Sequence, residues 1–275
     1  MILTVYHILA PWTMANKTKA GKHPCRSEFI PPTVKEVRMH YATSDLHGFP
    51  LTDFLRLLDK AGFSEDDELY VLGDVIDRNG DGGVEMLRWM MRQPNVTMLL
   101  GNHEAMLLGC DFFFNTVTDE SLDAVTPQQA GLLAHWMRNG AEPTLQGLKT
   151  LLHSSPDEFA DLLDYLRDAP LYEALSLPEG DFLLTHAGLG NFHPGKKISA
   201  YTPDDLLWHR PAPDETYFDT ITTVFGHTPT GYLDPSCNRR MLRTPTWIDI
   251  DTGASSGHSP MLLCLETLEP VYLDT

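Results

Sequence analysis

The 275-residue sequence predicts an α/β fold over most of its length. Short β-rich apolar runs recur along it, and each ends in a small cluster of Gly, Asp, His or Asn, as buried strands closed by turns do. Between the early runs lie stretches whose apolar residues have helical spacing. Strand–helix–strand alternation implies parallel pairing, and parallel sheets bind ligands at the carboxyl ends of their strands. We therefore expect the polar clusters to lie at the same end of one sheet.

Six apolar runs lead into polar clusters, and two further runs follow near the end of the chain. The first six are Val37–Thr43, Glu68–Leu72, Val96–Leu100, Phe182–Leu184, Thr222–Phe225 and Trp247–Ile248. Closing strands are predicted at Met261–Leu265 and Val271–Leu273. All eight runs are short and rich in the β-branched and aliphatic residues that buried strands favour.

Two helices are predicted between the first three strands. Leu51–Ala61 carries apolar residues three and four positions apart and ends at Gly62, a common helix stop. Gly83–Arg92 has the same spacing and stops before Pro94, which cannot continue a helix. These two segments are the crossovers that parallel strands require.

The chain divides into an irregular N-terminal extension, residues 1–36, and one domain, residues 37–275. The extension contains scattered Pro, Lys and Ser without a period, and Met39 is an alternative start of the domain. Residues 105–180 have Leu, Ala and Trp at helical spacing, with breaks at Asn139-Gly140 and Pro143 and no strand of comparable clarity. We expect this segment to be a helical insertion that forms a cap beside the site.

Charge and cysteine content limit the classes of partner and the compartment. The chain has 20 Lys and Arg against 38 Asp and Glu, a formal net charge of −18. Such a surface repels polyanions and anionic membranes, so neither nucleic acid nor a membrane is expected as a partner. The four Cys residues form no CxxC pair. No apolar run approaches the roughly 18 residues of a membrane span. We therefore expect a cytoplasmic protein with free thiols.

Each polar cluster, taken singly, has an ordinary structural explanation. Asp45-x-His47 is typical of a turn, and Gly73-Asp74-x-x-Asp77-Arg78 is typical of a turn that caps a helix. His186 and His227 would each be satisfied by a hydrogen bond in the core. These explanations fail for the set, because a single predicted sheet brings all the clusters to one end.

Together the clusters contain the donors of a dinuclear metal site. Two cations about 3.5–4 Å apart need a bridging carboxylate, with oxygen and imidazole donors on both sides. The residues of this kind are Asp45, His47, Asp74, Asn102, His186 and His227. A mixture of Asp, Asn and His favours Mn, Fe or Zn over Ca, which prefers oxygen ligands alone.

The joint set of motifs resembles the calcineurin-like metallophosphoesterase superfamily over residues 38–273. Within it, Asp77-Arg78 and Asn102-His103-Glu104 resemble the serine/threonine phosphoprotein phosphatase branch, particularly its small bacterial and phage members. Asn79 departs from the family, which usually has glycine after the arginine, and this puts the local turn in question. The resemblance implies a metallophosphatase-like β-sandwich of mixed sheets flanked by helices, with the helical insertion beside the active site.

The resemblance also implies a role for each residue. The first metal ion is held by Asp45, His47 and Asp74, and Asp74 bridges to a second ion completed by Asn102, His186 and His227. The two ions are expected to be Mn, with Fe or Zn as alternatives, and they share a hydroxide that attacks phosphorus directly. His103 is the general acid, Asp77 orients it, and Arg78 clamps the phosphate oxygens.

Some further polar residues are assigned less directly. Leu206-Leu207-Trp208-His209-Arg210 resembles the Leu-Trp-x-Arg segment of small bacterial members, so Arg210 is chosen as a second phosphate clamp; the alternative is a surface arginine. Asp249 and Asp251 are interpreted as structural or supporting residues. The basic run of Arg239, Arg240 and Arg243 is interpreted as a solvated hairpin, with a substrate-binding rim as the alternative.

The predicted function is therefore dinuclear metal-dependent phosphoester hydrolysis, by a serine/threonine protein phosphatase acting on phosphorylated proteins, peptides or small phosphoesters. The alternative is hydrolysis of a dinucleoside tetraphosphate or another nucleotide phosphoester. A metal-binding scaffold without catalysis is disfavoured, because such a scaffold needs no leaving-group acid like His103. Phosphopeptides are preferred because a dinucleoside polyphosphate calls for extra cations and an aromatic platform, and the basic run is not convincingly paired with aromatic residues.

Overall fold

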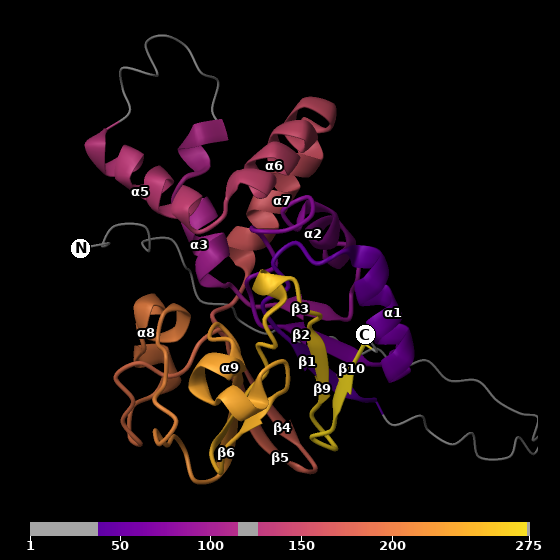
Figure 1. The fold of residues 1–275 in the computed structure, drawn as a ribbon, viewed down its shortest axis with the longest axis vertical. Coiled ribbons are helices and arrows are strands. Elements are labelled where there is room, and N and C mark those ends of the chain that lie inside the picture. The colour runs from indigo at the N-terminus through magenta and orange to yellow at the C-terminus, as the bar shows by residue number, and fades with distance from the viewer. Residues whose placement is uncertain (1–37, 115–125, 274–275) are drawn as a thin grey trace, which may run out of the picture. The chain divides into compact units, whose positions relative to one another are not determined.

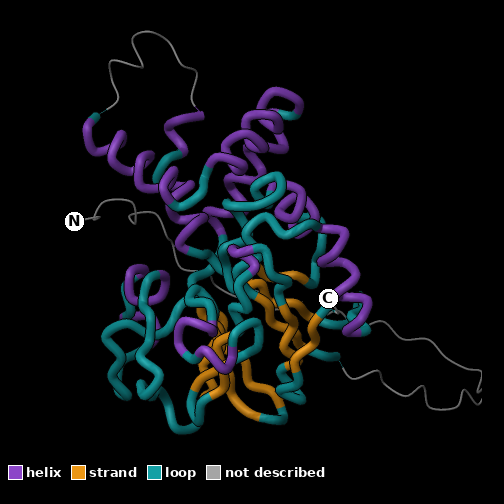
Figure 2. Tube along the Cα trace, viewed as in Figure 1, coloured by secondary structure: helices purple, strands orange, loops and turns teal. Residues whose placement is uncertain are grey.

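A computed structural model of the chain describes residues 38–114 and 126–273. The strands form two five-stranded sheets, and each sheet mixes parallel and antiparallel pairs (Figures 1 and 2). The predicted extension, residues 1–36, lies outside the described residues. The predicted α/β class with mixed sheets is confirmed.

The first sheet has the strand order β10-β9-β1-β2-β3. Its parallel part consists of β1 (His40–Thr43), β2 (Glu68–Val71) and β3 (Val96–Met98). Antiparallel β9 (Met261–Cys264) and β10 (Pro270–Tyr272) complete it. Both closing strands predicted from the sequence are therefore confirmed.

The second sheet has the order β4-β5-β6-β8-β7. Parallel pairs join β5 (Gly180–Thr185), β6 (Ile221–Phe225) and β8 (Trp247–Asp249). At the two edges, β4 (Tyr172–Leu177) and β7 (Leu242–Arg243) run antiparallel to their neighbours. The expectation of one sheet is therefore wrong, because three of the six runs that precede polar clusters belong to this second sheet.

Alternation along the strands explains why the sheets stack. In β2, Leu69 and Val71 pack into the core shared with the helices, whereas Tyr70 packs into a second core. That second core also receives Phe182 and Val224 from the other sheet, so it lies between the two sheets. Because side chains alternate across a strand, one run of apolar residues serves both cores.

Two crossover helices cover the outer face of the first sheet. Helix α1 (Leu51–Ala61) ends at Gly62, whose φ of 74° continues the chain in the left-handed region, as predicted. Helix α2 (Val84–Met90) lies within the predicted Gly83–Arg92 segment.

Helix α3 (Asn102–Leu108) begins inside a polar cluster. Shorter helices follow the strands of the second sheet: η2 (Ile198–Ala200), α8 (Pro203–Leu207), α9 (Thr230–Leu233), η3 (Pro235–Cys237) and η4 (Ala254–Ser256).

The predicted insertion is largely helical, with one exception. It contains η1 (Asp111–Phe114), α5 (Pro127–Arg138), α6 (Glu142–Ser154) and α7 (Pro156–Asp168). Proline in the first turn starts the three α-helices, and the predicted break at Asn139-Gly140 separates α5 from α6. Strand β4 lies within residues 105–180, however, which corrects the prediction of an insertion without a clear strand. Its Leu and Ala residues favour helix locally, and pairing with β5 overrides that preference.

Arg88 anchors the insertion to the sheet domain. Its Nε and Nη2 atoms both donate to Glu158 on α7, each at 2.8 Å. Leu148, Leu162 and Leu166 of the insertion belong to the same buried core as α1 and α2. Figure 1 shows α5, α6 and α7 grouped together beyond the strand ends. Among the described helices, none has the length and apolar character needed to cross a membrane.

Candidate active site

The polar clusters meet where the carboxyl ends of strands from both sheets face one another. Backbone hydrogen bonds join the first two clusters: Asp45 N–H donates to Gly73 O at 3.1 Å, and His47 N–H donates to Asp74 O at 2.9 Å. In the second sheet, Gly226 N–H donates to His186 O at 2.9 Å. The loops therefore support one another and do not depend on side-chain contacts alone.

Backbone strain is concentrated in these loops. Nine described non-glycine residues have positive φ, and six of them are predicted site residues: Asp45, His47, Asp74, Asp77, Arg78 and His227. Positive φ is unfavourable for residues with a Cβ, and such strain persists only where the surrounding structure enforces it. The cluster of strained residues therefore marks the place where side-chain direction matters most.

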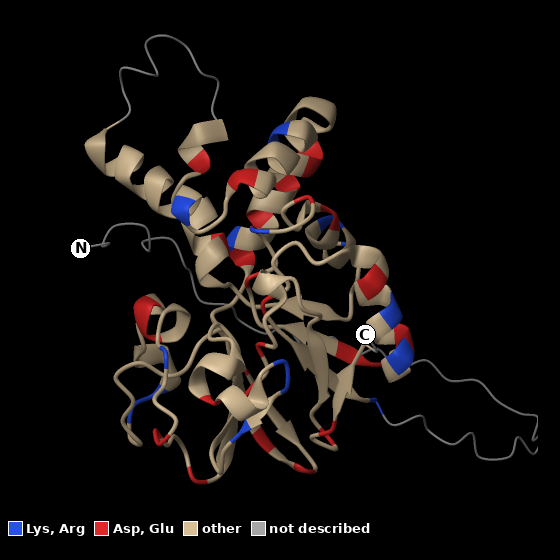
Figure 3. Ribbon diagram, viewed as in Figure 1, with Lys and Arg blue, Asp and Glu red and all other residues tan. Residues whose placement is uncertain are grey.

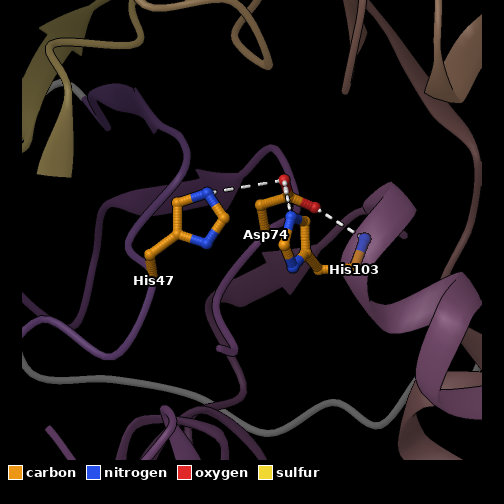
Figure 4. Close-up of side chains that lie close together, drawn as sticks. All are labelled: His47, Asp74 and His103. Atoms are coloured by element: carbon orange, nitrogen blue, oxygen red, sulfur yellow. Dashed lines mark hydrogen bonds and ion pairs between the residues drawn. The ribbon is translucent and has the colours of Figure 1, made fainter. Parts of the chain in front are cut away.

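Two groups of buried metal-type donors share Asp74. One group is His47, Asp74 and His103, and the other is Asp74, His186 and His227. Figure 4 shows Asp74 between His47, on the loop after β1, and His103, at the start of α3. The Nε2 atoms of His47 and His186 lie 3.6 and 3.4 Å from the two carboxylate oxygens of Asp74. A carboxylate in this position can serve two cations.

Asn102 and Asp45 stand beside these groups. The Asn102 Oδ1 atom lies 2.9 Å from His186 Nε2 and 3.0 Å from His227 Nδ1. Asp45 Oδ1 lies 3.9 Å from His47 Nε2, and Asp45 Oδ2 accepts from the His227 N–H at 2.8 Å. Gly226 is required here, because an added Cβ would overlap the Asp45 carboxylate. All six residues predicted as metal ligands are thus buried and gathered in one place.

The donor geometry fits metal ions. His47 Nδ1 and His186 Nδ1 lie 3.0 and 2.7 Å from the backbone carbonyls of Ile76 and Leu72, which leaves each Nε2 unprotonated. Two donors about 2.1 Å from one ion, with an angle of about 90–110° between the bonds, lie about 3.0–3.4 Å apart. The Asp74–His186 separation matches this spacing, and the Asp74–His47 separation is slightly longer.

The electrostatics of the cluster also favour the binding of metal ions. Burial lowers the pKa of His47 and lowers the pKa of His186 to about 3, so both imidazoles are neutral, the form that binds metals. Burial also raises the pKa of Asp45 and of Asp74 well above the usual range, because a buried negative charge without a cation is unfavourable. The fold therefore brings together two buried carboxylates whose ionised form divalent cations would stabilise.

A buried pair, His103 and Asp77, lies beside the shared carboxylate. His103 Nδ1 is 2.6 Å from Asp77 Oδ2, and His103 Nε2 is 3.3 Å from Arg78 Nη2. Asp77 is completely buried, and burial raises its pKa to about 7, although hydrogen bonds from Thr144 and Trp136 oppose that rise. With Nδ1 held by Asp77, Nε2 is the ring nitrogen left for proton transfer.

The helical insertion holds Asp77 in place. Trp136 Nε1, on α5, donates to Asp77 Oδ2 at 2.8 Å. Thr144 Oγ1, on α6, lies 2.6 Å from Asp77 Oδ1 and accepts from the Asp77 N–H at 2.9 Å. Neither residue stands out in the sequence, because a Trp and a Thr in a helical segment look like ordinary core positions. The available signal was the indole N–H of Trp136, because a buried Trp usually donates this group to a hydrogen-bond partner.

Glu104 has a structural role that the Asn102-His103-Glu104 motif does not by itself reveal. Its Oε2 accepts from the N–H groups of Asp74 and Gly101, and its Oε1 accepts from those of Val75 and Ile76, at 2.8–3.2 Å. Burial raises the Glu104 pKa to about 7. One carboxylate therefore sets the path of the backbone that carries Asp74 and caps the start of α3.

A cavity of about 250 Å³ opens over the two donor groups. Arg78 and Arg210 both line it, and so do Asn139 of the insertion and Asp251. Arg210 Nη1 donates to His227 O at 3.1 Å and to Thr228 Oγ1 at 2.9 Å, so this arginine, although exposed, is held at the cavity. Burial raises the Asp251 pKa to about 6, and its Oδ1 accepts from Gly253 N–H.

Asn79 joins the site loops. Its Nδ2 donates to His47 O at 3.0 Å and to Ala254 O at 3.1 Å. The turn that was in question is therefore formed with asparagine. Asp249 is fully buried, and its Oδ1 accepts from Asp251 N–H at 2.9 Å, which agrees with a supporting position.

The three arginines of the basic run separate in the structure. Arg240 lies over the Tyr272 ring at 4.5 Å, and Arg243 is exposed at the end of β7. Arg239 lines a second cavity. Figure 3 shows acidic residues on the helices as well as near the strands, so the negative charge is spread over the described domain.

Comparison with known proteins places these observations in a family. Residues 41–260 match the family model described as calcineurin-like phosphoesterase. A symmetrical bis(5'-nucleosyl)-tetraphosphatase of Acidovorax sp. (strain JS42) is 32% identical over 54% of this chain and 43% of its own length. The enzyme of the same name from Haemophilus ducreyi is 26% identical over 70% of this chain and 60% of its own. The matches thus span about half of each curated relative.

Solved structures share the fold at low identity. A candidate diadenosine tetraphosphatase superposes with a TM-score of 0.56 and 19% identity over 87% of this chain and 94% of its own. A cold-active protein-tyrosine phosphatase of a Shewanella species gives a TM-score of 0.51 and 20% identity over 85% and 77%. Because the family model covers most of the domain, and the shared-carboxylate donor groups lie within the matched residues, the chain belongs to the calcineurin-like phosphoesterase family.

Proposed function

We propose that this protein is a dinuclear metal-dependent hydrolase that cleaves dinucleoside tetraphosphates. The observation that carries the chemistry is Asp74, which lies between two groups of buried donors. The names of the curated relatives support the choice of substrate and favour it over a phosphoprotein. Hydrolysis of a dinucleoside tetraphosphate, the alternative predicted from the sequence, therefore replaces protein phosphatase activity as the favoured function.

We propose that Asp45, His47 and Asp74 hold one divalent ion, and that Asn102, His186 and His227 hold the second with Asp74. Bound divalent ions supply Lewis acidity and an ionised water at neutral pH. The chain supplies the remaining functions. Arg78 and Arg210 bind phosphate oxygens from the cavity wall, where a guanidinium offers several fixed donors. Asp77 orients His103, whose Nε2 is available for proton transfer to the leaving group.

One observation favours a second candidate, hydrolysis of alkyl phosphomonoesters such as phosphoserine. The His103–Asp77 pair is buried, and two residues of the insertion, Trp136 and Thr144, make three further hydrogen bonds to Asp77. A leaving alkoxide needs a proton, whereas a nucleoside diphosphate leaves as a phosphate whose pKa is about 6. A well-constructed proton donor is therefore of more use with an alkyl ester.

The test compares kcat/KM for diadenosine tetraphosphate and for a phosphoserine peptide, with the same Mn loading. We expect the dinucleotide to be preferred by more than about tenfold, equivalent to about 1.4 kcal/mol of transition-state stabilisation. Chromatography of the products should show two molecules of ADP, as cleavage at the middle of the tetraphosphate requires. Preference for the peptide would refute the proposed substrate and support the second candidate.

A further inference from the structure

A second cavity of about 300 Å³ adjoins the one over the donor groups. Pro229, Tyr232 and Ser256 line both cavities, so the two spaces share a boundary. The second cavity is formed by α9 and by the segments around Arg239 and Gly253. Figure 1 shows α9 next to the strand ends of the second sheet. A ligand that extends beyond the phosphate site can therefore reach this space directly.

Tyr232 stands at the boundary with its ring open to solvent. It is 81% exposed, against 40% for Leu55 and 41% for Met137, the other large exposed hydrophobic residues described. Among the described ring contacts, no aromatic or cationic side chain covers it. A single exposed aromatic is not unusual on a protein surface. One that lines two adjoining cavities is placed to stack on a planar ligand.

Arg239 brings positive charge to the same cavity. Its φ of 62° is one of the few left-handed non-glycine values outside the donor loops. Its neighbour Arg240 is engaged with Tyr272, so Arg239 is the arginine of this segment that faces the cavity. Arg239 and Tyr232 thus line the same cavity, although they were not associated in the sequence.

We propose that the second cavity binds one nucleoside of the dinucleoside tetraphosphate, with the base stacked on Tyr232 and a neighbouring phosphate held by Arg239. This proposal rests on the proposed function. Ligand cavities for drug-sized molecules measure about 300–1,000 Å³, so this one suits a nucleoside and not the whole dinucleotide. Asn238 and His258 line the same cavity and offer hydrogen-bonding groups to a base or ribose.

The experiment measures nucleoside recognition separately from phosphate binding. With Mn-loaded protein hydrolysing p-nitrophenyl phosphate, the inhibition constants of ADP and inorganic pyrophosphate are compared. Their ratio reports the contribution of the nucleoside. Tyr232→Ala should reduce that ratio by about 5- to 150-fold, because base–aromatic stacking has this magnitude. Tyr232→Phe keeps the ring and should retain the ratio.

Two arginine variants separate charge from stacking. Arg239→Ala should weaken ADP and pyrophosphate together, because both carry the phosphates that it contacts. Arg243→Ala removes the same charge from an exposed position of the same segment and should change neither constant. Thermal melting of each variant shows whether it is folded.

The outcomes distinguish this proposal from the proposed function. If diadenosine tetraphosphate is hydrolysed but Tyr232→Ala leaves the ADP-to-pyrophosphate ratio at the wild-type value, the nucleoside site is refuted and the function stands. If the dinucleotide is not hydrolysed while ADP still binds through Tyr232, the function is refuted and the nucleoside site stands. A Tyr232→Ala effect confined to phosphopeptide turnover would assign the cavity to a peptide and overturn the proposal.

Discussion

Replacing Trp136 by Phe tests whether the insertion controls the proton-transfer pair. The substitution keeps an aromatic ring but removes the Nε1–H that donates to Asp77 at 2.8 Å. Trp136 and Asp77 are both completely buried, so water cannot replace the lost donor. Above the Asp77 pKa of about 7 the acceptor is charged, and a hydrogen bond to a charged group contributes about 1.5–3 kcal/mol; the smaller ring adds a cavity term of about 1 kcal/mol. We expect the free energy of unfolding to fall by about 2.5–4 kcal/mol.

The chain offers a matched control in Trp247. This residue is also completely buried, but its Nε1 donates to a neutral backbone carbonyl, that of Glu215, at 2.8 Å. Trp247→Phe therefore has the same cavity term and loses about 0.5–1.5 kcal/mol of hydrogen bonding, a total of about 1.5–2.5 kcal/mol. Urea denaturation of both variants measures the difference.

Turnover gives the second measurement for Trp136→Phe. Looser positioning of His103 should lower kcat for an alkyl phosphate by about tenfold, a part of the roughly 10²–10⁴ that general acid catalysis contributes. The effect should be small for p-nitrophenyl phosphate, whose leaving group hardly needs a proton. The reasoning is refuted if Trp136→Phe is no less stable than Trp247→Phe and turns over alkyl phosphates at the wild-type rate.

Four further perturbations test other parts of the site. Asp74→Asn should remove nearly all activity and weaken the binding of both metal ions, measured by metal analysis of the purified variant; two tightly bound equivalents with normal turnover would contradict the shared-carboxylate assignment. His103→Asn should keep the metal content and lower kcat by about 10²–10⁴, less for aryl than for alkyl esters, and an equal loss for both would count against a proton-transfer role. Glu104→Gln should lower the free energy of unfolding by about 3 kcal/mol or more, because an NH₂ group would face two backbone N–H donors in a buried position; a melting temperature equal to that of the wild type would contradict this. Deleting residues 1–36 should leave turnover intact, since every candidate site residue follows residue 44, and a loss of turnover in the truncated protein would show that the prediction is wrong.

The packing of the insertion is linked to its hydrogen bonds with Asp77. Trp136 and Thr144 come from two helices that also bury apolar residues against the main core. Asp77 therefore depends on segments more than fifty residues away in the sequence for two of its hydrogen-bond partners. Substitutions that disturb the packing of α5 or α6 are expected to reach the active site through this carboxylate.

The sequence by itself determined the elements and the chemical inventory. Eight of the ten described strands could be located, all except β4 and β7, because a short apolar run closed by a turn reports local burial. The donors Asp45, His47, Asp74, Asn102, His186 and His227 could be named because their residue types have few other uses together. The family follows from the same motifs.

Only the tertiary structure decided how these parts meet. The strands form two sheets and not the one expected sheet. The pairing of strands depends on hydrogen bonds between distant segments and on the core between the sheets, and neither is visible in a single run of residues. Strand β4 was missed for the same reason, since its pairing with β5 outweighs local helix preference. The contacts of Trp136, Thr144 and Glu104 with the site loops, and the position of Tyr232 between two cavities, join residues distant in sequence. Such contacts leave no periodic pattern along the chain, because they arise only when separately formed elements pack against one another.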